Sequence, residues 1–170
     1  MGNALKVLLF TALAAFAYGC STDGCTDLRS AIPKAGFYSS ANARKISLDS
    51  LQIAGIGAPG DSILLAAGNA ESEVYLPMRS QQTTTTWCLS YKWKNTDHPG
   101  LNDTITFRYT AQPYFASAEC GAMYRYHVHS FSYTTHMIDS VKMTDSLITN
   151  NDAEQIQIFF RTAAEEGGNQ

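Results

Sequence analysis

The residues best suited to chemistry are two histidines, His127 and His129, which stand two positions apart. Successive side chains of a β-strand point to opposite faces, so both imidazole rings would leave the same face. A pair of neutral imidazoles at this spacing can bind zinc, and His136, after the following turn, is the candidate third ligand. The competing interpretation is an ordinary polar strand face, because Arg125 would lie on the same side and its charge would repel a metal. We expect no metal and no cofactor.

Two common catalytic groupings are missing from the sequence. A serine hydrolase elbow needs Gly-x-Ser-x-Gly, and no such stretch occurs. The only adjacent acidic pair, Glu165–Glu166, lies in the polar C-terminal tail, where it is badly placed to flank a glycosidic bond. We therefore expect a protein that is not an enzyme.

Aromatic residues crowd one third of the chain. Tyrosine combines an apolar ring with a polar hydroxyl, and such residues are common in surfaces that bind sugars and proteins. The favoured alternative is that about half of them belong to the core and the rest form cross-strand pairs. If a binding platform exists, the region from Pro113 to Tyr133 would meet a protein or a glycan. The aromatic residues concerned are Tyr109, Tyr114, Phe115, Tyr124, Tyr126, Phe131 and Tyr133.

The start of the chain has the anatomy of an export signal. Lys6 precedes an apolar run from Val7 to Ala17, and small residues lead to Cys20. The run is shorter than the ~20 residues that cross a bilayer. Residues 17–20, Ala-Tyr-Gly-Cys, resemble the lipobox of bacterial lipoproteins, in which the cysteine carries the lipid. Two or three acyl chains, at ~0.8 kcal/mol for each buried methylene, would hold the protein on a membrane.

This signal predicts how the chain is divided. Residues 1–19 would be a cleaved signal peptide, 20–32 a lipidated tether, 33–162 one domain and 163–170 a flexible tail. Ser21 follows the lipid site, so the aspartate signal that retains some lipoproteins in the inner membrane is absent, and we expect an outer-membrane location, without deciding which side the domain faces. The net charge is −3 and no cluster of Lys or Arg occurs, which argues against nucleic-acid binding.

Three cysteines besides Cys20 remain: Cys25, Cys88 and Cys120. In an oxidising compartment they allow one disulfide and one free thiol. Cys25 and Cys120 stand beside glycine in turn-like sequence, whereas Cys88 lies within an expected strand. We expect the pair Cys25–Cys120, and the sequence leaves the other two pairings open.

The elements that must position these residues are strands. From Pro33 onward the hydrophobic period is two, and turn residues separate the alternating stretches. This pattern predicts a single antiparallel β-sandwich of the immunoglobulin-like kind, with no amphipathic helix. The expected strands cover residues 51–56, 62–66, 74–78, 87–93, 103–112, 122–134, 140–143 and 156–160.

Several short motifs look familiar as a set. They are residues 103–110 (Asp-Thr-Ile-Thr-Phe-Arg-Tyr-Thr), 119–121 (Glu-Cys-Gly) and 138–141 (Ile-Asp-Ser-Val), together with 48–51 (Leu-Asp-Ser-Leu). Over most of residues 20–160 the chain resembles a domain-of-unknown-function family of small Bacteroidota lipoproteins. The resemblance implies a disulfide between the positions of Cys25 and Cys120 and brings no assigned activity.

A second motif recurs five times: Asp, then Ser or Thr, then an aliphatic residue. It resembles the O-glycosylation signal of exported proteins in the same bacterial group. The alternative is structural, because Asp-Ser is also suited to leaving a turn and entering a strand. The candidate sites are Ser50, Ser62, Thr104, Ser140 and Ser146.

Together these patterns predict a lipid-anchored, non-enzymatic binding or accessory module of the cell envelope, held to the membrane by its lipid. A purely structural envelope lipoprotein and a histidine-based metal-binding protein are the alternatives. The sequence leaves the ligand and the oligomeric state undecided.

Overall fold

The fold is a β-sandwich, seen in a computed structural model that describes residues 31–93, 96–118 and 120–162. Two sheets pack face to face, which confirms the predicted all-β sandwich. Within the described ranges, the helical segments are two single 3-10 turns, η2 (Pro59–Asp61) and η3 (Pro99–Leu101). Each falls in a stretch rich in Pro and Gly where the sequence predicts a turn.

The larger sheet has the strand order β10-β8-β7-β5-β2-β3, and β6 pairs with the end of β5. All pairings between its described strands are antiparallel. Its strands are β2 (Leu51–Gly55), β3 (Ile63–Leu65), β5 (Thr84–Trp93), β6 (Thr96–Asp97), β7 (Asp103–Ser117), β8 (Gly121–Tyr133) and β10 (Leu147–Ile148).

The smaller sheet has the order β4-β1-β11-β9, with β1 (Lys34–Ser39), β4 (Glu73–Tyr75), β9 (Ile138–Met143) and β11 (Glu154–Phe160). One of its pairs, β1 with β11, is parallel, so the expected purely antiparallel pairing is wrong at this place. The likeness to an immunoglobulin domain therefore lies in the two layers and not in the order of the strands.

Strand β1 was not among the expected strands, and its glycine shows why. A side chain at Gly36 would place its first carbon 2.2 Å from a carboxylate oxygen of Glu154, so a larger residue here would have to displace the end of that side chain. The glycine interrupts the alternating pattern that identifies a strand in sequence. The hydrogen-bonded pairing with β11, from the far end of the chain, makes this segment a strand although its local sequence pattern does not indicate one.

The core lies between the sheets and is built from the alternate residues that the sequence assigns to inner faces. Trp87 and Phe107, from neighbouring strands, are both buried and meet edge to face at 5.2 Å. The core also includes Ala31, which is 2% exposed, so the packed domain begins before the expected boundary at residue 33. In the alternating pattern of β11, Gln155 lies on the side opposite to Ile156. It is buried as well, and it accepts a hydrogen bond from the backbone N–H of Lys34.

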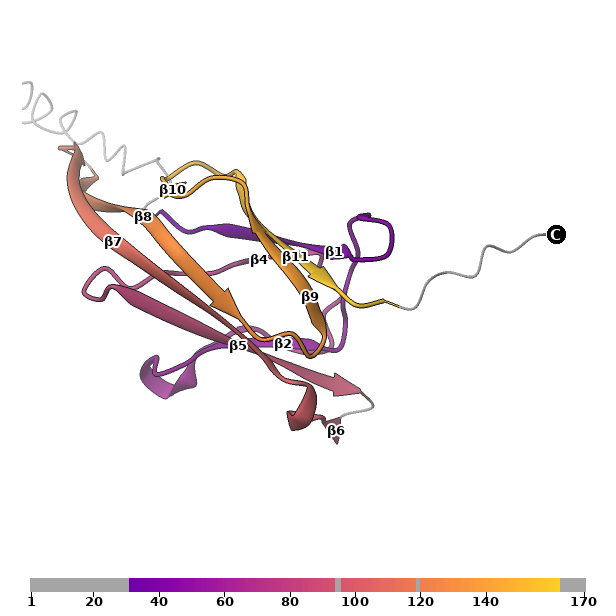
Figure 1. The fold of residues 1–170 in the computed structure, drawn as a ribbon. Coiled ribbons are helices and arrows are strands. Elements are labelled where there is room, and N and C mark those ends of the chain that lie inside the picture. Colours follow the sequence, from indigo (N-terminus) through magenta and orange to yellow (C-terminus); the bar gives the residue numbers. More distant parts are fainter. Residues whose placement is uncertain (1–30, 94–95, 119, 163–170) are drawn as a thin grey trace, which may run out of the picture.

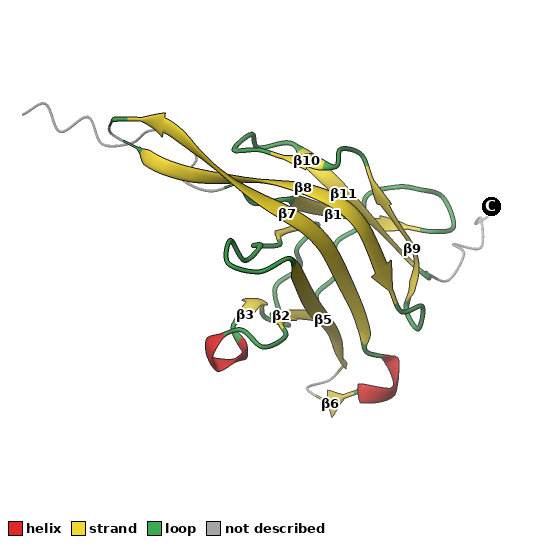
Figure 2. Cartoon of the chain, turned by 60° about the vertical axis from the view of Figure 1, so that its left-hand side comes forward, coloured by secondary structure: helices red, strands yellow, loops and turns green. Residues whose placement is uncertain are grey.

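The hairpin of β7 and β8 is the longest element and reaches beyond the rest of the sandwich (Figures 1 and 2). The first half of β7 alternates between buried and partly exposed residues, as a strand over a core must. After Tyr109 no residue of β7 is buried, and of the residues that follow on this strand Ala111 still packs against the core. The hairpin therefore has a packed base and a projecting end.

Candidate functional site

The inner face of the β7–β8 hairpin is held to the sandwich by tyrosine hydroxyls. Tyr109 donates a hydrogen bond to the backbone oxygen of Arg79 and accepts one from its N–H, each at 2.9 Å. Farther along, the hydroxyl of Tyr126 reaches the backbone oxygen of Met78 at 3.5 Å. Two of the aromatic residues in the crowded region thus fix the loop between β4 and β5.

The described aromatic side chains do not form a flat exposed tyrosine cluster. Tyr109 and Tyr126 are buried, and Phe131 and Tyr133 are partly buried, stack on each other at 6.3 Å and pack against the core. The exception is Phe115, near the projecting end, which is 72% exposed. The arrangement agrees with the alternative of core residues and cross-strand pairs, and it leaves one exposed phenyl ring.

The outer face of the same hairpin carries His127 and His129. Their rings are 4.9 Å apart, and Nε2 of His129 lies 2.6 Å from the hydroxyl oxygen of Thr110. Arg108 pairs with Ser130 and Tyr109 pairs with Val128, so His129 is the extra residue of a β-bulge. The bulge leaves the two rings on one side of the strand, as predicted.

The third expected metal ligand is not part of this group. Nδ1 of His136 lies 3.3 Å from Asp103 Oδ1, in the turn between β8 and β9. Within the described ranges, no group of three or more His, Cys, Asp or Glu side chains could hold a metal ion. The three-histidine arrangement is therefore wrong, because the turn after Tyr133 places His136 against a different strand.

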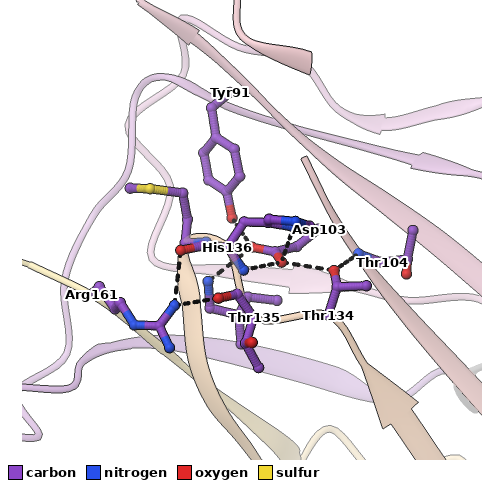
Figure 3. A network of polar contacts seen from close by, with 9 residues as sticks. Tyr91, Asp103, Thr104, Thr134, Thr135, His136 and Arg161 are labelled. Carbon is purple, nitrogen blue, oxygen red and sulfur yellow. Dashed lines mark hydrogen bonds and ion pairs between the residues drawn. The ribbon is translucent and has the colours of Figure 1, made fainter. Parts of the chain in front are cut away.

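The most extensive polar network surrounds Asp103, the first residue of β7 (Figure 3). Its carboxylate is 0% exposed and accepts hydrogen bonds from three consecutive backbone N–H groups, those of His136, Met137 and Ile138, each at 2.8 Å. The hydroxyl of Thr134 donates at 2.7 Å and that of Tyr91 at 3.3 Å.

These contacts set the charge state of the carboxyl. Burial alone would raise the pKa of Asp103, but the hydrogen bonds from His136, Ile138, Thr134 and Met137 outweigh it and hold the pKa below its ordinary value. Burial raises the pKa of Tyr91 well above its ordinary value, so the phenol stays protonated and able to donate. A carboxylate this fully satisfied is poorly suited to act as a base, and it fixes the turn from β8 to β9 instead.

This role of Asp103 was not predicted from the sequence, where the residue marks only a strand boundary and a glycosylation motif. The available signal was an acidic residue at the very start of an apolar strand, where the chain can form turns around it. That signal is weak, because the donors lie about 30 residues away, at Thr134 to Ile138.

The candidate glycosylation sites differ in exposure. Ser62 and Ser146 are exposed, whereas Ser50, Thr104 and Ser140 are partly buried. Ser62 donates to the backbone oxygen of Pro59, and the backbone N–H of Leu147, after Ser146, donates to Asp145. The second contact is the turn chemistry that the structural alternative predicts.

The described cysteines differ as well. Cys88 is a free, partly buried thiol whose pKa is raised by burial. Cys120, in the turn between β7 and β8, is disulfide-bonded. Cys20 and Cys25 lie outside the described residues, as do residues 163–170, so the lipid site and the predicted partner of Cys120 stay predictions.

Two shallow hollows lie elsewhere on the domain. One, of about 430 Å³, lies beside Trp93 and is lined by Asp49, Ser50, Gln52 and Lys92, among others. The other, of about 510 Å³, lies between β8 and the end of β9 and is lined by Val128, His129, Phe131 and Met143, among others. Among the residues that line them, neither brings together a serine, a histidine and a carboxylate.

The comparison with protein families gives one match. The model of a family of unknown function (DUF6452) matches residues 50–160. The chain belongs to this family. The match spans strands β2 to β11, including the Asp103 network and the β7–β8 hairpin. This confirms the expected membership of a domain-of-unknown-function family.

No curated protein and no solved structure matches the chain. In the part of the chain that the structure describes, no helix has the length and apolar character needed to cross a membrane.

Proposed function

We propose that this protein is a lipid-anchored accessory module of the cell envelope, tethered through Cys20 with the projecting end of the β7–β8 hairpin toward the membrane. The observation that carries the proposal is the position of Cys120 in the turn of this hairpin, close in sequence to the exposed Phe115. The backbone N–H of Cys120 donates to the hydroxyl oxygen of Ser117, where the two strands meet.

The tether supplies the orientation. If Cys25 is the partner of Cys120, the lipid on Cys20 lies five positions along the chain from the cysteine bonded to the hairpin turn, a reach of at most ~17 Å. A phenyl ring so close to the bilayer can enter its apolar boundary and add to the attachment made by the acyl chains. Residues at the opposite end of β7, about 40 Å away, would face away from the membrane.

The anchor is tested in a cell that makes the protein naturally. We expect the full chain to take up an alkyne-labelled fatty acid and to sediment with membranes, and Cys20→Ala to lose both properties. Peptide mapping without reduction should recover a Cys25–Cys120 cross-link and an alkylated Cys88. Label and sedimentation that persist in Cys20→Ala would contradict the proposal.

The orientation is tested separately on the lipidated protein in vesicles that contain brominated lipids. Tryptophan fluorescence should be quenched in Phe115→Trp. The unsubstituted chain, whose tryptophans are the buried Trp87 and Trp93 at the far end of β5, should show little quenching. Equal quenching of the two proteins would contradict the orientation and leave the anchor standing.

Glycosylation belongs to the same proposal, and its best-placed sites are the exposed Ser62 and Ser146. The intact mass of the natively produced protein should exceed the mass of polypeptide plus lipid. Ser62→Ala combined with Ser146→Ala should remove the excess. A mass explained by lipid alone would exclude the modification.

A further inference from the structure

The outer face of β7 and β8 carries positive charge and, among the described residues of these two strands, no negative charge. Directly opposed residues of antiparallel strands share a face, so the register places Arg108 beside Ser130, Thr110 beside His127, and Gln112 beside Arg125. We call this surface the basic face and define it by Arg108, Thr110, Arg125, His127, His129 and Ser130. All six residues are exposed, and no described element packs over them.

The two arginines of the basic face have no ion-pair partner among the described residues. Arg108 makes no side-chain hydrogen bond to them either. Arg125 donates through Nε to Gln112 at 3.2 Å, and its guanidinium lies 5.9 Å from the ring centre of Tyr114. These contacts orient Arg125 and leave its terminal N–H groups for a ligand. A guanidinium is the side chain best suited to bind a sulfate, phosphate or carboxylate with two hydrogen bonds.

The histidine pair lies between the arginines along the hairpin. Because His129 contacts Thr110 through Nε2, its ring is held in position beside His127. Each imidazole carries a ring N–H that can donate a hydrogen bond to an anion lying close to both rings. Two exposed carboxylates belong to or adjoin the large sheet: Asp97 pairs with Lys92, and Asp145 accepts the backbone N–H of Leu147.

Hydroxyl groups surround these charges. The next row toward the base of the hairpin is Thr86, Thr106 and Ser132, in which the hydroxyl oxygens of the two threonines are 2.9 Å apart. Arg108 and the row of Arg125 are separated by four residues of β7, or ~14 Å, with the histidines between them. This spacing is wider than the ~3.4 Å of helix axis that each phosphate of one DNA strand occupies.

We propose that the basic face binds an acidic glycan, whose anionic groups contact Arg108, Arg125 and the histidine pair while its hydroxyls bond to the Thr and Ser side chains. The carbohydrate class follows from the combination of sparse cations with many hydroxyls on a flat sheet. This inference concerns a different face from the hairpin end and does not depend on the lipid anchor.

The test measures binding of the full chain in detergent to a dextran sulfate oligosaccharide by calorimetry, at low and physiological salt. Arg108→Gln and Arg125→Gln should each weaken binding about ten-fold. The matched control is Arg44→Gln, which removes the same charge from an exposed loop after β1 and should leave the affinity unchanged. Binding of the unsubstituted chain should weaken as salt is added, and an uncharged dextran of the same length should bind at least ten-fold more weakly.

Three outcomes would overturn the proposal. The first is an equal loss of affinity in Arg44→Gln, which would show an effect of net charge alone. The second is equal affinity for the uncharged dextran. The third is preferential binding to phosphatidylglycerol vesicles or to a single-stranded oligonucleotide, which would assign the face to lipid or nucleic acid. Thermal unfolding of each variant should match that of the parent, so a loss of binding cannot come from unfolding.

Discussion

On the outer face of the small sheet, Lys34 and Lys45 lie against carboxylates, whereas on the outer face of the large sheet Arg108 and Arg125 have none among the described residues. Lys34 Nζ lies 2.7 Å from Asp152 Oδ1, and Lys45 Nζ lies 2.7 Å from Glu73 Oε2 and 3.5 Å from Glu154 Oε2. These ion pairs join β1, β4 and β11, so the lysine charges are neutralised by carboxylates of the protein itself.

Strand β7 of the large sheet has one carboxylate side chain, that of Asp103, and it lies on the inner face of the sheet. Asp103 is surrounded by donors there, and the outer residues of β7 and β8 around the basic face carry hydroxyl, amide, imidazole and guanidinium groups. Such a division leaves one face neutralised and the other able to attract anions in a protein of negative net charge. The comparison indicates which face is available to a ligand.

The largest effect should follow from removing the inner carboxylate. Asp103→Asn replaces an acceptor oxygen by a donor group that faces backbone N–H groups, and it should lower the free energy of unfolding by about 3 kcal/mol. Asp139→Asn is the matched control, because Asp139 is exposed and pairs with Arg161 at 3.7 Å. It should cost less than ~1 kcal/mol in urea unfolding. Equal costs for the two variants would contradict the structural role of Asp103.

Lowering the pH should also reveal the contribution of the Asp103 carboxylate to stability. The folded-state pKa of Asp103 lies below its unfolded value of ~3.9, so its stabilisation is present at neutral pH and is lost as the pH falls below ~4 toward the folded pKa. Hydrogen bonds with Lys45 and Lys34 likewise lower the pKa of Glu73 and Asp152, but those groups are exposed and screened by salt.

In urea unfolding at a series of pH values in 1 M NaCl, the parent should therefore still lose stability on acidification, and Asp103→Asn should lose much less. Curves of the same slope for the two proteins would show that Asp103 does not carry the acid dependence.

Breaking the network on the small sheet should have a smaller effect. Glu73→Gln removes a partner of Lys45 and a more distant partner of Lys34 at 3.9 Å, and exposed pairs of this kind contribute less than ~1 kcal/mol. The difference from the parent in urea unfolding should shrink further in 1 M salt. A cost above ~2 kcal/mol, or one independent of salt, would show that this network is more than a set of surface ion pairs.

The smallest effect on stability, with a clear effect on binding, should come from placing a carboxylate beside an arginine of the large sheet, as the small sheet has carboxylates beside its lysines. Ser130→Glu places a carboxylate directly opposite Arg108 and should change the free energy of unfolding by less than ~0.5 kcal/mol. Affinity for dextran sulfate should fall about ten-fold. Ser130→Gln is the control for side-chain size and should keep the affinity. A fall of equal size in Ser130→Gln would point to steric blocking instead of charge.

Much of the fold could be predicted from alternation alone. The inner positions Ile105, Phe107 and Tyr109 of β7 are buried as expected. The expected stretches contain β2 and β3 and overlap β4, β5, β8, β9 and β11, whose first residues lie one to three positions earlier than expected. Strand β1 was missed because Gly36 breaks the pattern, and β6 and β10 because two residues are too short to show one.

The candidate site was predicted less completely. The shared face of His127 and His129 follows from a spacing of two residues, and the ring contact confirms it. The place of His136 could not follow in this way, because a turn separates it from β8 and its neighbour Asp103 belongs to another strand. The aromatic region likewise contained both core tyrosines and one exposed phenylalanine, which composition cannot distinguish.

The sequence by itself determined which residues alternate, and therefore the all-β class and the two faces of each long strand. It also carries the export and lipidation signal on which the proposed location depends. Only the tertiary structure decided that β1 pairs with β11, that Asp103 points inward to the turn after β8, and that the basic face has no carboxylate among its described residues. The reason is physical: side-chain alternation is a property of neighbouring residues, whereas the partners of a charge depend on the register between segments that are far apart in the chain.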